Sequence, residues 1–174
     1  MTNKIKNKVN HKSKSSIDSL ENRTNIKVCL VGSSGGHLTH LYMLKPFWKN
    51  KERFWVTFDK EDAQSLLEGE KVYPCYFPTN RNIKNLIRNI GVAWWVLWKE
   101  KPDLLISSGA AVAVPFFYFA KLMGKKLIYI EVFDRIDKPT MTGKMVYPIV
   151  DKFIVQWEDQ KKVYPKAINL GGIF

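Results

Sequence analysis

The sequence predicts an α/β fold, a Rossmann-like, doubly wound parallel sheet with helices on both faces. Two observations support this prediction. Short apolar runs of strand length alternate with segments whose apolar residues recur at helical spacing, which is typical of βαβ units. Apolar residues also make up 45% of the 174 residues, which is enough to bury both faces of a parallel sheet.

The first half of the expected domain begins at residue 25. Residues 1–24 are rich in lysine, asparagine and serine, so we expect a disordered basic tail, either a solvated extension or a tether to anionic lipid. A buried strand is then expected at 26–31 and a helix at 37–49, whose apolar positions follow a 3.6-residue period. The next elements are a strand at 53–58, a helix at 61–67, a strand at 72–77 and a long helix at 82–100.

The second half continues the same alternation. A strand is expected at 104–107, and a helix at 111–123 ends at Gly124. A strand at 126–131, a helix at 140–147, a strand at 152–156, a helix at 158–164 and a strand at 167–170 complete the pattern. With right-handed crossovers, these elements form one Rossmann-like domain over residues 25–174.

Charge and cysteine content narrow the classes of partner. The net charge of +12 favours an anionic partner, such as nucleic acid, anionic lipid or a phosphate-bearing substrate. No nucleic-acid-binding module is recognisable, so we expect no nucleic-acid partner. Cys29 and Cys75 lie in apolar runs and are expected to be reduced core thiols, with no zinc-like spacing and therefore no metal. No apolar segment suits a signal peptide or a membrane span, so we expect synthesis and retention in the cytosol.

The loop after the first strand carries the clearest candidate chemistry. Gly35 and Gly36 let the backbone approach a phosphate closely, and the following helix begins with free N–H groups. The segment lacks both the dinucleotide fingerprint and the P-loop pattern, so we expect no cofactor. His37 is either a base that works near neutral pH or a histidine that closes a tight turn. His40 is expected to lie on a helix face.

Two further loops follow later strands at the same expected edge of the sheet. Ser108 and Gly109 belong to a turn of small residues that lets a ligand approach, or that only permits tight helix–sheet packing. Glu131 ends a buried strand and is expected to point into the crevice, with Asp134 and Arg135 just beyond it. The alternative for this second loop is a salt-bridged turn without a ligand.

The helix at 82–100 contains an uncharged run that is rich in tryptophan. One face is expected to be buried and the opposite side to carry Val92, Trp95 and Val96. The six apolar positions of the buried face are Ile83, Ile87, Ile90, Trp94, Leu97 and Trp98. Arg88 and several lysines flank the run, which is too short to span a bilayer. The helix is therefore an interfacial helix on an anionic membrane, a surface for another chain, or a fully buried helix.

Five segments taken together resemble a known family. They are GSSGGHLTHL at 32–41, PDLLISSGAAVAVPFFY at 102–118, IYIEVFDRID at 128–137, PTMTGKMVYPIVDKFIVQWEDQ at 139–160 and YPKAINLGGIF at 164–174. Through them, residues 26–174 resemble the membrane-associated subunits of two-chain UDP-sugar glycosyltransferases. One branch is the anchor subunit of the N-acetylglucosaminyltransferase that builds dolichol-linked oligosaccharide. The more similar branch comprises bacterial capsule and exopolysaccharide subunits.

The resemblance implies the N-terminal, acceptor-binding half of a GT-B glycosyltransferase, with the UDP-sugar held by a second chain. It implies a polyprenyl-pyrophosphate-linked acceptor, with His37 as the base and Glu131 as a second catalytic candidate. The residues expected to bind the acceptor or its pyrophosphate are Ser33, Ser34, Gly35, Gly36, Ser108, Gly109 and Arg135. Those expected to contact membrane or partner are Arg88, Trp94, Trp95 and Trp98.

The resemblance also implies a place in the cell. Eukaryotic anchor subunits carry an N-terminal transmembrane helix, whereas this sequence has a basic tail there. We therefore expect peripheral binding at the cytoplasmic face of the cell membrane. The alternative function is a purely structural adaptor that recruits a catalytic partner to the membrane without supplying a catalytic group.

Overall fold

A computed structural model describes residues 25–79 and 82–172, so the predicted tail at 1–24 lies outside the described residues. The described chain forms a seven-stranded sheet in the order β3-β2-β1-β4-β5-β6-β7, and all neighbouring strands are parallel. The strands are β1 (Lys27–Val31), β2 (Glu52–Phe58), β3 (Val72–Cys75), β4 (Leu104–Ser107), β5 (Lys126–Ile130), β6 (Lys152–Val155) and β7 (Ile168–Asn169). The predicted doubly wound parallel sheet is confirmed.

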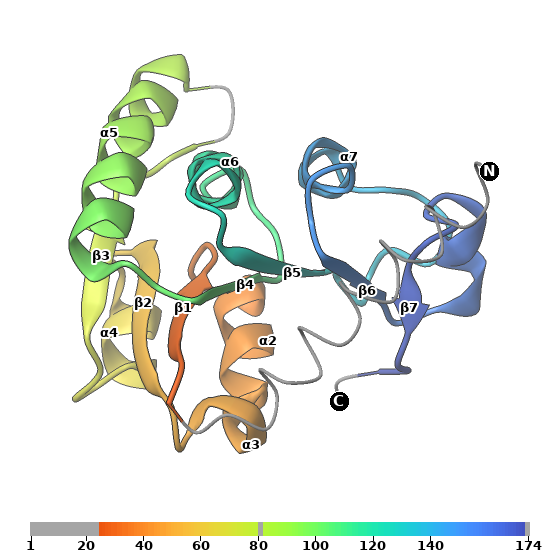
Figure 1. The fold of residues 1–174 in the computed structure, drawn as a ribbon, viewed down its shortest axis with the longest axis horizontal. Helices are drawn as coiled ribbons and strands as arrows, with labels where there is room; N and C mark the ends of the chain where they lie inside the picture. Colours follow the sequence, from red (N-terminus) through yellow and green to blue (C-terminus); the bar gives the residue numbers. More distant parts are fainter. Residues whose placement is uncertain (1–24, 80–81, 173–174) are drawn as a thin grey trace, which may run out of the picture.

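Helices cover both faces of this sheet, as Figure 1 shows. One layer comprises α2 (Gly36–Met43), α3 (Lys45–Trp48) and α4 (Glu61–Leu66), and the other comprises α5 (Ile83–Glu100), α6 (Ala113–Leu122) and α7 (Met141–Val146). A 3₁₀ helix, η1 (Glu158–Lys162), connects β6 to β7. Each layer packs on its own apolar cluster.

The central strand shows how the two clusters arise. Side chains of a strand alternate between the faces of a sheet. Val28 and Leu30 of β1 therefore pack in the cluster under α2 and α4, whereas Cys29 and Val31 pack in the cluster under α5 and α6. Cys29 and Cys75 are both buried free thiols, in agreement with the expectation from the sequence.

Two of the expected helices differ in detail. The helix expected at 37–49 is divided at Leu44, whose ψ of 15° ends α2, and α3 begins at the next residue. Pro46 explains the division, because proline is tolerated in the first turn of a helix but not in the interior of one. The helix expected at 158–164 is the short 3₁₀ helix η1.

The buried face predicted for α5 is confirmed at Leu97 but wrong at its other positions. Ile83, Ile87 and Trp98 are 73%, 62% and 64% exposed, and Ile90 and Trp94 are exposed beside them. Besides Leu97, the face that meets the sheet contains Asn85, Asn89, Ala93 and Val96, although Val96 was expected near the opposite side.

Hydrogen bonds explain this reversal. The side chain of Asn89 accepts from the backbone N–H of Tyr76 at 2.8 Å and donates to its carbonyl at 3.0 Å. Asn85 donates to the carbonyl of Pro78 at 3.0 Å. The two asparagines thus bond backbone groups just beyond β3, so they lie inside beside Ala93, Val96 and Leu97, and the stripe of larger apolar side chains faces outward.

None of the helices described here combines the length and apolar character that crossing a membrane requires.

Candidate functional site

The candidate site lies where the order of the sheet reverses. The chain leaves β1 toward β2 on one side, and β4 lies on the other side of β1. In open parallel sheets, ligands bind in the crevice beyond the carboxyl ends of strands at such a switch point. The loops after β1 and β4 flank this crevice, so the Gly-Gly-His segment and the Ser108–Gly109 turn are brought together, as the sequence predicts.

His37 and Ser108 connect these two loops through a pair of hydrogen bonds. The Nδ1 of His37 lies 2.9 Å from the carbonyl oxygen of Ser108. The Ser108 hydroxyl in turn donates to the carbonyl of His37 at 2.7 Å. A carbonyl oxygen can only accept, so Nδ1 carries the proton of the neutral ring and Nε2 holds the lone pair.

The surroundings of His37 keep its ring neutral. Burial lowers its pKa below the ordinary value of 6.5, while the hydrogen bond to Ser108 and the charges of Asp134 and Glu131 act in the opposite direction. Burial outweighs these effects, so the unprotonated imidazole predominates at neutral pH. A neutral ring whose Nε2 has a lone pair can accept a proton from a bound hydroxyl group.

Gly109 provides the space that the His37 ring occupies. Its φ of +127° lies in a region that favours glycine. A Cβ at this position would lie 2.6 Å from Cε1 of His37 and 3.2 Å from the hydroxyl of Tyr129. The small residues of this turn therefore determine where the imidazole sits, and they do more than pack a helix on the sheet.

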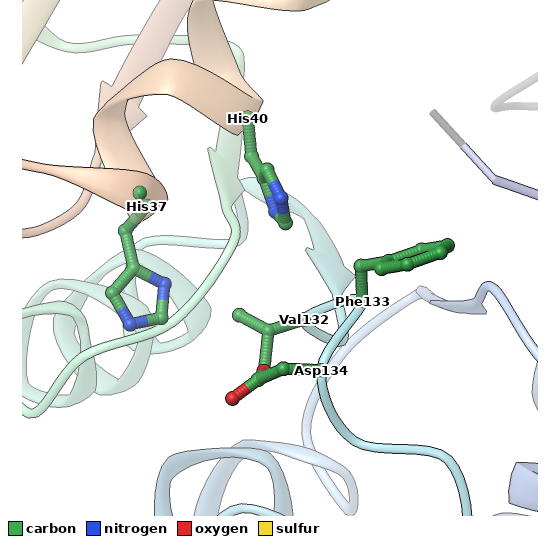
Figure 2. A pocket seen from close by; sticks show the side chains of 6 residues that line it. His37, His40, Val132, Phe133 and Asp134 are labelled. Atoms are coloured by element: carbon green, nitrogen blue, oxygen red, sulfur yellow. The ribbon is translucent and has the colours of Figure 1, made fainter. Parts of the chain in front are cut away.

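His37 lines three adjoining cavities. The first, of about 440 Å³, lies between α2 and the loop after β5. In Figure 2, His37 and His40 border it from one side, and Val132, Phe133 and Asp134 border it from the other.

The other two cavities extend the crevice in different directions. One of about 300 Å³ is lined by Arg135, Thr140, Tyr129 and apolar side chains of α6 and α7. The third, of about 220 Å³, is lined by Ser33, Ser34, Lys60 and neighbouring residues from the loops after β2 and β3. His37 is thus at the centre of a branched depression.

Glu131 does not reach these cavities, contrary to the expected orientation. It is 0% exposed. Its carboxylate accepts hydrogen bonds from the hydroxyls of Thr140 and Tyr164, each at 2.9 Å, and from the backbone N–H of Val132 at 3.1 Å. A buried carboxylate needs such donors, and here they come from the loop before α7 and the residues after η1. Glu131 therefore holds the wall of the site, including Thr140, in place.

The glycine loop is partly occupied by a side chain of the protein itself. The backbone N–H of Gly35 donates to the carboxylate of Asp62 at 2.6 Å, and its φ of +78° requires glycine-like freedom. Gly36 lines the cavity of about 440 Å³, and Ser33 and Ser34 line the cavity of about 220 Å³. The four residues of this loop therefore face different surroundings rather than one common anion.

The structure thus gathers most of the residues singled out by sequence, but not all of them. Arg88, Trp94, Trp95 and Trp98 lie on α5 and line none of these cavities. Sequence reasoning also missed several lining residues: His40, Lys60, Tyr129 and Thr140. His40 is buried and its pKa is lowered by burial, so it is not a simple helix-face residue. The sequence signal that could have identified His40 is its spacing of three residues from His37, which places both side chains on one face of a helix.

Comparison with known proteins relates the chain to one family. A family model described as "Oligosaccharide biosynthesis protein Alg14 like" matches residues 28–173. The human UDP-N-acetylglucosamine transferase subunit ALG14 is 26% identical over 182 aligned positions, which cover 87% of this chain and 84% of the human protein. The match thus extends over nearly all of the described domain.

Solved structures share the fold. MurG of Acinetobacter baumannii superposes with a TM-score of 0.65 at 14% identity over 77% of this chain. MnaA of S. aureus, solved with UDP, superposes with a TM-score of 0.67 at 14% identity over 85% of this chain. The chain spans 42% and 45% of the lengths of these two proteins, so it corresponds to less than half of either.

Proposed function

Because the chain belongs to the Alg14-like family of oligosaccharide biosynthesis proteins, we propose that it is one subunit of a UDP-sugar glycosyltransferase. In this proposal it binds the acceptor, and a second chain carries the UDP-sugar. The human relative is named as a subunit of a UDP-N-acetylglucosamine transferase, which supports a two-chain enzyme. The likeness to less than half of MurG supports a single half of a GT-B fold. The acceptor is a polyprenyl-pyrophosphate-linked sugar in bacterial capsule or exopolysaccharide assembly.

The observation that carries this proposal is the neutral, oriented imidazole of His37 at the switch point. Its Nδ1–H is held by Ser108, so Nε2 is available as a base in the crevice. In the reaction, the acceptor hydroxyl oxygen attacks the anomeric carbon while the bond from that carbon to the UDP oxygen breaks. His37 takes the hydroxyl proton and UDP leaves with the bonding electron pair, so the configuration inverts.

The other residues in this proposal position the acceptor. Ser33, Ser34 and Gly36, together with Gly109 and the Ser108 turn, form the walls around His37. Arg135 and Thr140 line the second cavity. Glu131 was a catalytic candidate by sequence, but it is assigned a positioning role here, because it acts through Thr140 and does not line the cavities.

The same proposal includes peripheral binding at the cytoplasmic face of the cell membrane. The stripe formed by Ile83, Ile87, Ile90, Trp94 and Trp98 faces outward on α5. Helices α5, α6 and α7 contain one acidic residue, Glu100, which is buried and paired with two lysines. Their exposed cations are Lys84, Arg88, Lys99, Lys121 and Lys144. An apolar stripe with flanking cations suits the surface of an anionic membrane.

Sugar transfer tests the proposal. Membranes containing this chain, a candidate donor-binding chain, or both are given labelled UDP-sugars and the endogenous lipid acceptor. We expect turnover only when both chains are present, because donor and acceptor sites lie on different polypeptides. Turnover by this chain alone would refute the division of the enzyme into two halves.

A further inference from the structure

A chain of hydrogen-bonded side chains runs behind His37, from Tyr129 through Thr140 to Glu131. The hydroxyl oxygen of Tyr129 lies 3.3 Å from Oγ1 of Thr140, and this atom lies 2.9 Å from Oε1 of Glu131. Tyr129 is on β5, Glu131 follows that strand, and Thr140 precedes α7. Tyr129 and Glu131 are both 0% exposed, so water does not compete for the two ends of the chain.

The protons of this chain all point toward Glu131. The Glu131 carboxylate accepts from the hydroxyl of Tyr164, from backbone N–H groups and from the hydroxyl of Thr140. A threonine hydroxyl has one proton, so Thr140 uses it on Glu131 and Tyr129 is the donor to Thr140. Thr140 also accepts from the backbone N–H of Gly143 at 2.9 Å, which uses its second lone pair. Burial raises the pKa of Tyr129, so its hydroxyl keeps the proton that this arrangement requires.

The Tyr129 end of the chain adjoins the His37 ring at Gly109. A Cβ on Gly109 would lie 2.6 Å from Cε1 of His37 and 3.2 Å from the hydroxyl oxygen of Tyr129. Glycine has no side chain, so none of its atoms screens one group from the other. His37 and Tyr129 also line the same cavity of about 300 Å³. Because the Tyr129 proton points to Thr140, the negative oxygen end of its O–H dipole is left on the side of Gly109 and His37.

We propose that the carboxylate of Glu131 and the two hydroxyls between it and His37 stabilise the positive charge that the imidazole gains when it takes the acceptor's proton. This inference rests on the proposed function. In that step Nε2 forms the new N–H bond, Nδ1–H stays on the Ser108 carbonyl, and the hydroxyl protons do not move. Fixed dipoles directed at a developing charge in a buried site lower the barrier. The three residues of the chain thus act on the base as positioning residues and need not touch the substrate.

Other charged groups also face His37, and solvent distinguishes them from Glu131. The titratable side chains that line cavities together with His37 are those of His40, Lys60, Tyr129, Asp134 and Arg135. Against the dominant effect of burial, the charges of Asp134 and Glu131 both raise the pKa of His37. Asp134 borders the cavity of about 440 Å³ opposite the two histidines (Figure 2), and its side chain is 75% exposed, so dissolved salt screens its charge. Glu131 is 0% exposed, so its effect persists in salt.

NMR titration of the His37 ring tests the proposal without the sugar-transfer reaction. The intact chain is titrated as wild type, Tyr129→Phe, Glu131→Gln and Thr140→Ser, and the His37 signals are assigned by their absence in His37→Asn. The matched control is Tyr118→Phe, since Tyr118 donates its hydroxyl to a backbone carbonyl of α7 at 3.0 Å but lines none of the His37 cavities.

The proposal makes a signed expectation for each variant. Tyr129→Phe and Glu131→Gln should lower the pKa of His37, because a negative charge or dipole that favours the imidazolium is lost. Thr140→Ser keeps the hydroxyl that connects the chain, so the pKa of His37 should stay at the wild-type value. If Glu131→Gln does not fold, Tyr129→Phe decides the test. An unchanged pKa of His37 in folded Tyr129→Phe, or an equal shift in the control, would overturn the proposal.

Salt separates the contribution of the buried chain from that of Asp134. At about 1 M KCl the Debye length falls to about 3 Å. The decrease in the pKa of His37 caused by Asp134→Asn should then largely disappear, whereas the decrease caused by Tyr129→Phe should remain. Loss of both effects in salt would show that the buried chain makes no separate contribution, and the proposal would fail.

Steady-state kinetics of the two-chain enzyme show whether sugar transfer uses this stabilisation. Tyr129→Phe should lower kcat about tenfold at a nearly unchanged KM for the acceptor, less than the cost of about 10²–10³-fold for losing a donor bonded directly to the reacting group. The acid limb of the kcat/KM profile should move to lower pH, in the same direction as the pKa of His37. A raised KM at unchanged kcat would mean that Tyr129 binds the acceptor instead, and it would overturn the proposal. A lowered pKa of His37 in a pair of chains that transfers no sugar contradicts the proposed function, while the effect of the chain on the His37 charge stands.

Discussion

The imidazole of His37 owes its chemistry to neighbours that are distant in sequence. Ser108 fixes the tautomer, Gly109 makes room for the ring, and burial lowers the pKa. The sequence allowed His37 to be selected because it begins a helix after a glycine-rich strand end. The sequence alone did not show whether His37 is a base or a turn residue. The answer depends on its contact with Ser108, which is 71 residues away in the sequence.

The pH dependence of turnover follows from this environment. A general base works in its unprotonated form, and the pKa of His37 is lowered below 6.5. We expect kcat/KM of the two-chain enzyme to be constant at neutral pH and to fall, approaching about tenfold per pH unit, only below pH 6.5. The measurement is a pH profile of kcat/KM, with binding of the two chains followed in the same buffers. An inflection above 6.5 would contradict the assignment.

Residues such as Glu131 and Lys60 show where prediction from sequence fails. Glu131 follows a buried strand, and the end of such a strand faces the crevice as a rule. The hydroxyls of Thr140 and Tyr164 hold its carboxylate inward. These partners lie 9 and 33 residues away, so the sequence around Glu131 does not identify them. Lys60 was missed because its place in the wall of a cavity becomes visible only in the fold, where its ammonium lies over the ring of Phe77 from the loop after β3.

At the scale of elements, most helices and strands were predictable and the orientation of α5 was not. Apolar periodicity locates a helix, but the rule that its apolar face is buried assumes that the sheet needs only apolar partners. Here Asn85 and Asn89 satisfy backbone groups beyond β3, so the face that meets the sheet combines these two asparagines with Ala93, Val96 and Leu97. Trp95, expected opposite the buried face, lies at the flank of the stripe, where its ring contacts Tyr73 edge to face.

The proposed membrane binding assigns the contact to α5, so it can be tested at this element. Ile87→Glu combined with Trp98→Glu places two charges in the exposed stripe. We expect partition onto vesicles containing phosphatidylglycerol to fall more than about tenfold, since burying each of these side chains is worth roughly 1.5–3 kcal/mol.

The matched control for this test is Met43→Glu, which adds a charge at an exposed apolar position on α2, across the sheet. Its partition should equal that of the wild type. If the double variant also binds vesicles as the wild type does, in a folded state by circular dichroism, the stripe does not meet lipid.

At the scale of the whole molecule, the fold class was the most secure prediction. Alternating strands and helices, together with continuous apolar strands such as β1, leave few topologies once right-handed crossovers are required. The resulting order of strands places the loops after β1 and β4 side by side, which is why a site could be expected there. The division of the crevice into three cavities depends on individual side chains and could not be anticipated.

The central claim is that this chain supplies the base of a two-chain transferase, and His37→Asn tests it most directly. Asparagine keeps a donor that can reach the Ser108 carbonyl but removes Nε2. The measurement is kcat of the reconstituted two-chain enzyme, with affinity between the chains determined in parallel. We expect kcat to fall by about 10²–10⁴-fold while the affinity between the chains is unchanged. Full turnover by His37→Asn would contradict this claim and would identify the chain as an adaptor without a catalytic group.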